Sequence, residues 1–269
     1  MSDPARVLTT FDADRQVAHV QLNRPEKRNG VDLAMFEGMI AAGEALIPRK
    51  DVRAVVLSGN GPSFCAGLDF ASFMASGPES MQRLLDRPDG RVDNMAQRFA
   101  WVWTEVPAPV IAAINGHAYG AGIQLALAAD IRFAAPDAKL SVMEIKWGMI
   151  PDMSISRTLA RLVRPDIAKE LTFTGRVVSG REAKELGLVT HVADDPVAAA
   201  LELAGEIASK SPTAIRNAKR LYNSTQGLDD RAALALETKL LLELLGSANQ
   251  LEAVQANFMK RPPKFRDPE

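Results

Sequence analysis

Cysteine is nearly absent from this chain of 269 residues, in which Cys65 is the one example. A single cysteine cannot form an internal disulfide or a cysteine-based metal cluster. Histidine is also scarce, and its three copies lie far apart without a recognisable nucleophile or metal spacing. We therefore expect no metal site, and we expect Cys65 to be a small buried residue rather than a nucleophile.

Neither positively nor negatively charged residues are in excess. The chain has 32 Lys and Arg against 33 Asp and Glu, so its net charge is −1. It also has no apolar run approaching the roughly 20 residues of a membrane span and no signal-like N-terminus. These absences predict a soluble, cytoplasmic protein that binds neither nucleic acid nor membrane.

The arrangement of apolar residues indicates an α/β fold with a helical C-terminal part. We expect a core domain over residues 1–195 and a helical region over 196–269. Strands are expected at 17–22, 53–58, 110–114, 131–134 and 139–142. Helices are expected at 33–47, 94–104, 123–129, 154–163, 166–173, 180–186, 196–209, 212–224, 229–245 and 247–259. Residues 70–90 show no clear period, as in a mobile flap.

The last helices carry wide leucine faces that include Leu234, Leu240 and Leu245. So much apolar surface favours either contacts between subunits or burial within the chain. The sequence alone weighs these two explanations equally.

Two glycine-containing turns are the most informative feature that the chain does have. The first glycine turn (residues 63–69) follows an expected strand and contains Gly67, and the second (residues 115–122) precedes an expected helix. A turn at a helix start leaves backbone N–H groups unpaired, with a helix dipole behind them. If the two turns face each other, each can donate one N–H to a developing oxyanion.

These segments resemble the crotonase, or enoyl-CoA hydratase/isomerase, superfamily from about residue 7 to 259. The motifs that carry the resemblance are Leu22-Asn23-Arg24-Pro25-Glu26-Lys27-Arg28-Asn29, Phe64-Cys65-Ala66-Gly67-Leu68-Asp69, Asn115-Gly116 with Gly120-Ala121-Gly122, and Ser179-Gly180-Arg181-Glu182-Ala183. The resemblance implies a spiral of β-β-α units with a helical trimerisation region, assembled as a homotrimer or a dimer of trimers.

The resemblance further implies an acyl thioester of coenzyme A as substrate, with no cofactor beyond that coenzyme A. The oxyanion donors would be the N–H groups of Leu68 and Ala121. Backbone around Ala66 would meet the adenine, and Lys260 would reach a phosphate, on a neighbouring subunit. The residues implied for coenzyme A binding are Lys27, Arg28, Asn29, Ala66, Asp69 and Lys260.

The catalytic acids implied by the resemblance depart from the pattern of its hydratases, which hold one water with two glutamates. Glu144 corresponds to one of them, but Gln124 stands where the other is expected, and an amide cannot exchange a proton at neutral pH. A second acid, Asp152, follows eight residues after Glu144, a spacing that resembles dienoyl-CoA isomerases. Asp152 could instead cap a helix that starts near Ser154.

Three functions remain open on these grounds. The favoured one is isomerisation of an enoyl- or dienoyl-CoA, with Glu144 as base and acid and Asp152 assisting. The second is hydration of 2-enoyl-CoA, in which Glu144 acts on a water that Gln124 orients. The third, from another class, is a non-catalytic protein of this fold that binds acyl-CoA or a partner.

Overall fold

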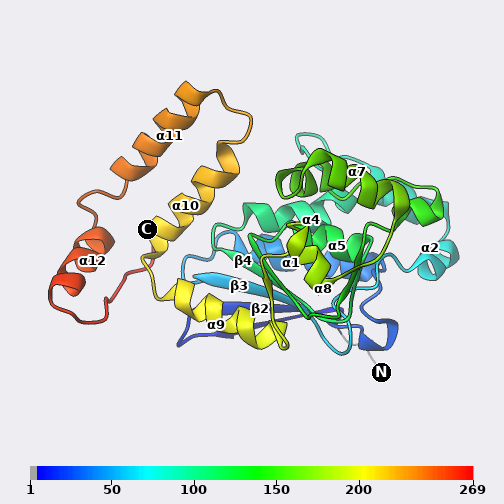
Figure 1. The fold of residues 1–269 in the computed structure, drawn as a ribbon, viewed down its shortest axis with the longest axis horizontal. Coiled ribbons are helices and arrows are strands. Elements are labelled where there is room, and N and C mark those ends of the chain that lie inside the picture. Colours follow the sequence, from blue (N-terminus) through cyan, green and yellow to red (C-terminus); the bar gives the residue numbers. More distant parts are fainter. Residues whose placement is uncertain (1–4, 269) are drawn as a thin grey trace.

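The computed structural model describes residues 5–268 and confirms the α/β class (Figure 1). Its main sheet has the strand order β1-β2-β3-β4-β6-β9, in which β1 is antiparallel to β2 and every other pair is parallel. Its strands are β1 Val7–Asp12, β2 Val17–Leu22, β3 Ala54–Gly59, β4 Val110–Ile114, β6 Ile131–Ala134 and β9 His191–Val192. Strands β1 and β9 had no counterpart in the sequence-based prediction.

A second, smaller sheet contains β5, β7 and β8, with β7 in the middle. Its strands are β5 His117–Tyr119, β7 Lys139–Ser141 and β8 Val178–Ser179. Strand β5 lies inside the second glycine turn, so that turn is built partly from extended backbone.

The α-helices follow most of the expected ranges within a few residues. They are α1 Leu33–Leu46, α2 Phe70–Ser76, α3 Pro78–Leu85, α4 Met95–Glu105, α5 Ala121–Leu127, α6 Ile155–Thr158, α7 Pro165–Thr174, α8 Gly180–Glu185, α9 Pro196–Ala208, α10 Pro212–Ser224, α11 Asp230–Leu242 and α12 Ala248–Phe258. Three short 3-10 helices, η1 to η3, cover Pro25–Lys27, Glu144–Trp147 and Leu159–Arg161. Among residues 5–268, no helix has the length and apolar character needed to cross a membrane.

Two of the expected helix features differ in the structure. Residues 70–90, which lacked a clear period, contain α2 and α3 rather than an irregular flap. The single helix expected at 154–163 is the short α6 followed by η3, and its first residue Ser154 has a left-handed φ of 62°.

The main sheet has a hydrophobic core on each of its two faces, because successive side chains along a strand point to opposite faces. Val55 and Leu57 of β3 belong to the larger core, which also contains α1, α4 and α5. Ala54 and Val56 of the same strand belong to a smaller core on the other face, against α9. Parallel strands buried on both faces are apolar at consecutive positions, as β3 is.

Helix α9 packs on the sheet through alanines spaced four residues apart, Ala200, Ala204 and Ala208. It contacts β2, β3, β4 and β6. The predicted division at residue 195 stays a prediction, but the first helix beyond it belongs to the packing of the main sheet.

Helices α10 to α12 extend away from the two sheets (Figure 1). On α11, Leu240 is buried, whereas the Leu234 and Leu241 side chains are more than half exposed. Subunit contacts through this region, and a trimer or a dimer of trimers, stay predictions.

The two glycine turns lie side by side and are joined by a short parallel ladder. The Cys65 N–H donates to the His117 oxygen at 2.8 Å, and the Tyr119 N–H donates to the Cys65 oxygen at 3.0 Å. One residue earlier, the Phe64 N–H donates to the Asn115 oxygen at 2.9 Å. The condition on which the oxyanion argument rested, that the two turns face each other, is met.

This ladder leaves no room for a side chain at Gly122, so Gly122→Ala should destabilise the fold. A Cβ there would lie 2.5 Å from the Cys65 carbonyl oxygen. We expect a loss of about 1–3 kcal/mol in the free energy of unfolding, measured by urea denaturation. The matched control is Gly205→Ala in α9, where the nearest atom would lie 3.9 Å away. That change should stabilise by about 0.5–1 kcal/mol, and equal effects of the two would contradict the close approach.

Candidate active site

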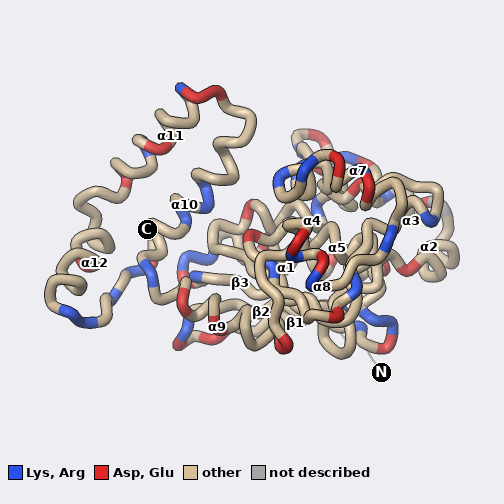
Figure 2. The backbone as a smooth tube through the Cα atoms, viewed as in Figure 1, with Lys and Arg blue, Asp and Glu red and all other residues tan. Residues whose placement is uncertain are grey.

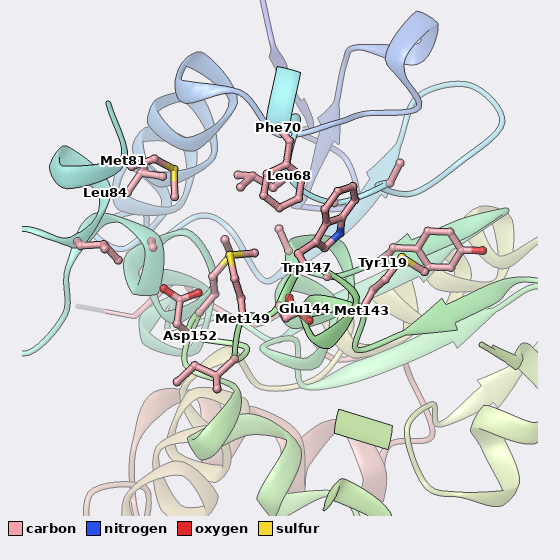
Figure 3. A pocket seen from close by; sticks show the side chains of 18 residues that line it. Leu68, Phe70, Met81, Leu84, Tyr119, Met143, Glu144, Trp147, Met149 and Asp152 are labelled. Carbon is pink, nitrogen blue, oxygen red and sulfur yellow. The ribbon is translucent and has the colours of Figure 1, made fainter. Parts of the chain in front are cut away.

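A cavity of about 500 Å³ opens between the two glycine turns, α3 and the segment that follows β7. Figure 3 shows the side chains that line it. They are mostly apolar, and four of them are methionines, namely Met81, Met143, Met149 and Met153. The described residues that line the cavity include two ionisable carboxyl groups, those of Glu144 and Asp152. Such an apolar cleft with few polar groups is the usual form of a small-molecule site.

Leu68 and Ala121, whose backbone N–H groups are the expected oxyanion donors, both line this cavity. Neither donates a hydrogen bond to any described residue. The first follows Gly67, whose φ is 94°, and the second begins α5 directly after Gly120, whose φ is 50°. A Cβ on Gly67 would lie 4.0 Å from the Ala121 nitrogen. The two free donors therefore belong to adjoining backbone that approaches closely because it lacks side chains.

Glu144 is buried beside these donors at the start of η2. Its Oε1 accepts a hydrogen bond of 2.6 Å from Gln124 Nε2. Its Oε2 is buried and has no hydrogen-bond partner among the described residues. A Cβ on Gly120 would lie 3.2 Å from Oε1, so the glycine also makes room for this carboxyl.

Burial raises the pKa of Glu144, and the nearby negative charge of Asp152 adds to that rise. The hydrogen bond from Gln124 acts in the opposite direction, because it stabilises the carboxylate. The carboxyl is therefore set to exchange protons at a higher pH than an exposed glutamate. A raised pKa of this kind is suited to general acid–base chemistry.

Asp152 is half-buried and lines the same cavity as Glu144. Burial raises its pKa as well. In Figure 3 its carboxyl lies on the side of Met81 and Leu84, whereas Glu144 lies nearer to Trp147 and Met143. The two acids thus face different stretches of one apolar cavity.

The alternative assignment of Asp152 as a helix cap is wrong. The N-cap of α6 is Ser154, and α6 has no side-chain capping hydrogen bond. A cap stabilises a helix by accepting from an N–H of the first turn, and Asp152 makes no such contact. Asp152 lines the cavity instead.

Gln124, on α5, is completely buried and does not line the cavity. Besides its bond to Glu144, its Oε1 accepts from the Met153 N–H at 2.8 Å. The side-chain amide therefore connects the segments that carry the two acids. Both of its polar atoms are occupied inside the protein.

Two residues expected at the coenzyme A site have internal partners for their side chains. Asn29 is fully buried and donates to the carbonyl oxygens of Asn60 and Ser63. Asp69 caps α2 through Ser72 and pairs with Arg24 at 2.8 Å. Burial disfavours the Asp69 carboxylate, but the bonds from Ser72 and Arg24 outweigh it and lower its pKa to about 2. These side chains hold the first glycine turn in place.

The other residues expected at the coenzyme A site lie at the surface or in the backbone. Lys27 and Arg28 are exposed, and the Ala66 N–H donates to the Arg28 oxygen at 2.9 Å. Lys260 follows α12, which lies at the opposite end of the molecule from α2 (Figure 1). Within one chain, it is therefore remote from the first glycine turn. A role of these residues in binding stays a prediction.

Cys65 is a small buried residue, as expected, and it lies in the ladder between the two turns. Burial raises the pKa of its thiol to about 12. A thiol that stays protonated at neutral pH is a poor nucleophile.

The wall made by α2, α3 and η2 had no counterpart in the sequence-based prediction. Leu84 and Met81 of α3 line the cavity. At its mouth the rings of Phe70 and Trp147 pack against each other, with their centroids 4.4 Å apart. A signal for α3 was present, because Gly77 and Pro78 mark a helix start and Met81 is followed by Leu84 and Leu85 at helical spacing. The aromatic pair joins residues 77 positions apart, and no local pattern reports such a contact.

Comparison with known proteins agrees with this geometry. A family model described as enoyl-CoA hydratase/isomerase matches residues 12–268. The human mitochondrial methylglutaconyl-CoA hydratase is 31% identical, over 98% of this chain and 78% of its own length. The mouse mitochondrial Delta(3,5)-Delta(2,4)-dienoyl-CoA isomerase is 34% identical, over 94% of this chain and 79% of its own length. A crystal structure of an enoyl-CoA hydratase from Bacillus anthracis has a TM-score of 0.89 at 32% identity, covering 97% of this chain and 98% of that one.

Replacing Gln124 by leucine should raise the pKa of Glu144 further, because the carboxylate loses its side-chain donor. A ¹³C NMR titration of the Glu144 carboxyl measures this directly. The change also leaves the Met153 N–H buried and unpaired, at a cost of about 1–3 kcal/mol in stability. The matched control is Gln255→Leu on α12, where the glutamine is exposed. An unchanged titration of Glu144 in Gln124→Leu would contradict the role assigned to the amide.

Proposed function

The chain belongs to the enoyl-CoA hydratase/isomerase family of enzymes, and from this membership we propose that it moves a carbon–carbon double bond in an enoyl- or dienoyl-CoA. The likeness to solved structures confirms the crotonase-type fold. The substrate in this proposal is an acyl thioester of coenzyme A. No cofactor is proposed beyond the coenzyme A of that substrate.

One observation carries the choice of isomerisation. Asp152 lines the same apolar cavity as Glu144, while the amide of Gln124 is buried and makes one hydrogen bond through its nitrogen and one through its oxygen. Two carboxyl groups along one acyl chain suit the removal of a proton at one carbon and its return at another. A pair that holds one water needs both groups directed at the same point.

The first step in the proposal is proton abstraction from C2 of the thioester. The carboxylate of Glu144 takes the proton, and the electron pair moves onto the thioester oxygen as an enolate. The N–H groups of Leu68 and Ala121 bind that oxygen. Loss of one such donor costs about 2.7–4 kcal/mol in comparable sites. In this proposal the two glycine turns therefore supply a large part of the stabilisation of the enolate.

The second step returns a proton farther along the chain. In a 3-enoyl thioester it arrives at C4, and in a 3,5-dienoyl thioester at C6, which leaves a double bond in conjugation with the carbonyl. The Asp152 carboxyl, on the Met81 side of the cavity, supports delivery at the distant carbon. The substrate gains and loses no atom overall. Glu144 ends this step protonated and Asp152 ionised, so a proton passes back from Glu144 to Asp152 through solvent before the next cycle.

Hydration of 2-enoyl-CoA remains the second candidate because relatives named as hydratases match nearly the whole chain. The buried Oε2 of Glu144 lacks a protein partner and could accept from a water. The Gln124 side chain is not part of the cavity wall, so it is poorly placed to hydrogen-bond such a water.

Product analysis with purified protein separates the candidates. We expect 3-enoyl or 3,5-dienoyl thioesters to give conjugated products, followed by absorbance and mass spectrometry. Turnover only of 2-enoyl thioesters, to 3-hydroxy products, would instead establish the hydratase. Tight binding of coenzyme A esters without any turnover would establish the non-catalytic alternative.

Substitution of the two acids tests their separate roles in deuterium oxide. Glu144→Gln should lower both C2 deuterium exchange and isomerisation by about 10²- to 10⁴-fold. Asp152→Asn should lower isomerisation of the dienoyl substrate but retain C2 exchange. Asp194→Asn, at an exposed position, is the control. Full activity of Glu144→Gln on every accepted substrate would show that the assignment is wrong.

The pH dependence of the reaction follows from the raised pKa of Glu144. The base must be ionised, so kcat/KM should fall as pH drops through that raised pKa, at a higher pH than for an exposed glutamate. A pH–rate profile checks this. An acid limb at the ordinary glutamate range would show that burial does not control the base.

A further inference from the structure

The acyl cavity has a one-sided charge composition. Among the described residues that line it, Glu144 and Asp152 are the ionisable carboxyl groups, and none is Lys, Arg or His. The remaining wall is aliphatic, aromatic or methionine side chain together with glycine and alanine backbone. A negatively charged group inside would find no cation to pair with, and such pairing is what makes a buried charge tolerable.

Lys and Arg are spread along the chain (Figure 2), but none of the described ones lines the cavity. The Lys146 ammonium lies 5.9 Å from the centroid of the Trp147 ring, but Lys146 is exposed and does not line the cavity. At the rim, Ile150 and Leu85 are apolar and more than half exposed. An acyl chain that passes this rim meets apolar surface from the mouth inward.

We propose that this site selects acyl groups without charge and rejects those that carry a free carboxylate. The inference rests on the proposed function and refines its substrate class. A carboxylate on the acyl chain would share one apolar cavity with the ionised carboxylate of Glu144, and no cation lines that cavity to offset either charge. Its binding would carry the cost of its own desolvation as well as of repulsion by Glu144.

The methionines indicate which uncharged chains the cavity accepts. Met81 comes from α3, whereas Met149 and Met153 come from the segment between η2 and α6. Their unbranched thioether side chains adapt to ligands of different shape. The wall is therefore suited to uncharged chains of varied length more than to one rigid acyl group.

The test compares two 3-enoyl thioesters with the same number of carbons, one ending in a methyl group and the other in a carboxylate. We expect kcat/KM to be lower for the carboxylated substrate by on the order of 100-fold. Equal values for the two substrates would overturn the inference.

A variant at the rim tests whether charge, rather than shape, causes this difference. Leu85→Lys places a cation at an exposed lining position, and Leu85→Gln is the neutral control of similar length. The lysine variant should improve the ratio of carboxylated to uncharged kcat/KM by roughly 5- to 10-fold. The glutamine variant should leave that ratio near the parent value. Equal ratios in both variants would contradict an electrostatic origin.

Binding measurements keep this inference separate from the proposed reaction. Saturated thioesters of coenzyme A, one with a methyl and one with a carboxylate end, are compared by calorimetry with the unmodified protein. If no enoyl thioester is converted but the methyl-ended ester binds far more tightly, the reaction is wrong and the selectivity holds. If both are bound equally while isomerisation proceeds, the selectivity is wrong and the reaction holds.

Discussion

The backbone ladder between the two glycine turns is the interaction on which the site depends. Its hydrogen bonds, through Cys65 and its neighbours, fix two segments that are about fifty residues apart in the sequence. Only backbone this close can present two N–H groups to one oxygen atom. Gly122 and Gly67 are therefore required for their lack of a side chain, and the apolar burial of Cys65 keeps water from competing for the ladder.

A second constraint follows from placing a carboxyl beside those donors. Glu144 loses most of its hydration there, and an unpaired buried charge is costly. The amide of Gln124 offsets part of that cost through one bond, while its other end binds the backbone next to Asp152. The acids thus keep raised pKa values and fixed positions without a cation that would hold them permanently ionised.

Much of this arrangement could be predicted from the sequence, for identifiable reasons. The parallel strands are continuous apolar runs, and the turns contain glycines at the two positions of close approach, so both leave local signals. The inward orientation of Gln124 had no such signal, because it depends on a contact with Glu144 twenty residues away. Strand β9 has two residues, too few for any period. The aromatic pair of Phe70 and Trp147 is likewise set by tertiary packing alone.

The separation of the two acids from the two glycine turns along the chain has a consequence for how such proteins can diverge. The turns, at residues 63–69 and 115–122, carry the N–H groups proposed to bind the thioester oxygen, and the acids lie on a different short stretch, between Met143 and Met153. Substitutions in that stretch can redirect where a proton is delivered while the ladder stays intact. A new reaction that still passes through the same thioester enolate can thus arise with little loss of folding stability.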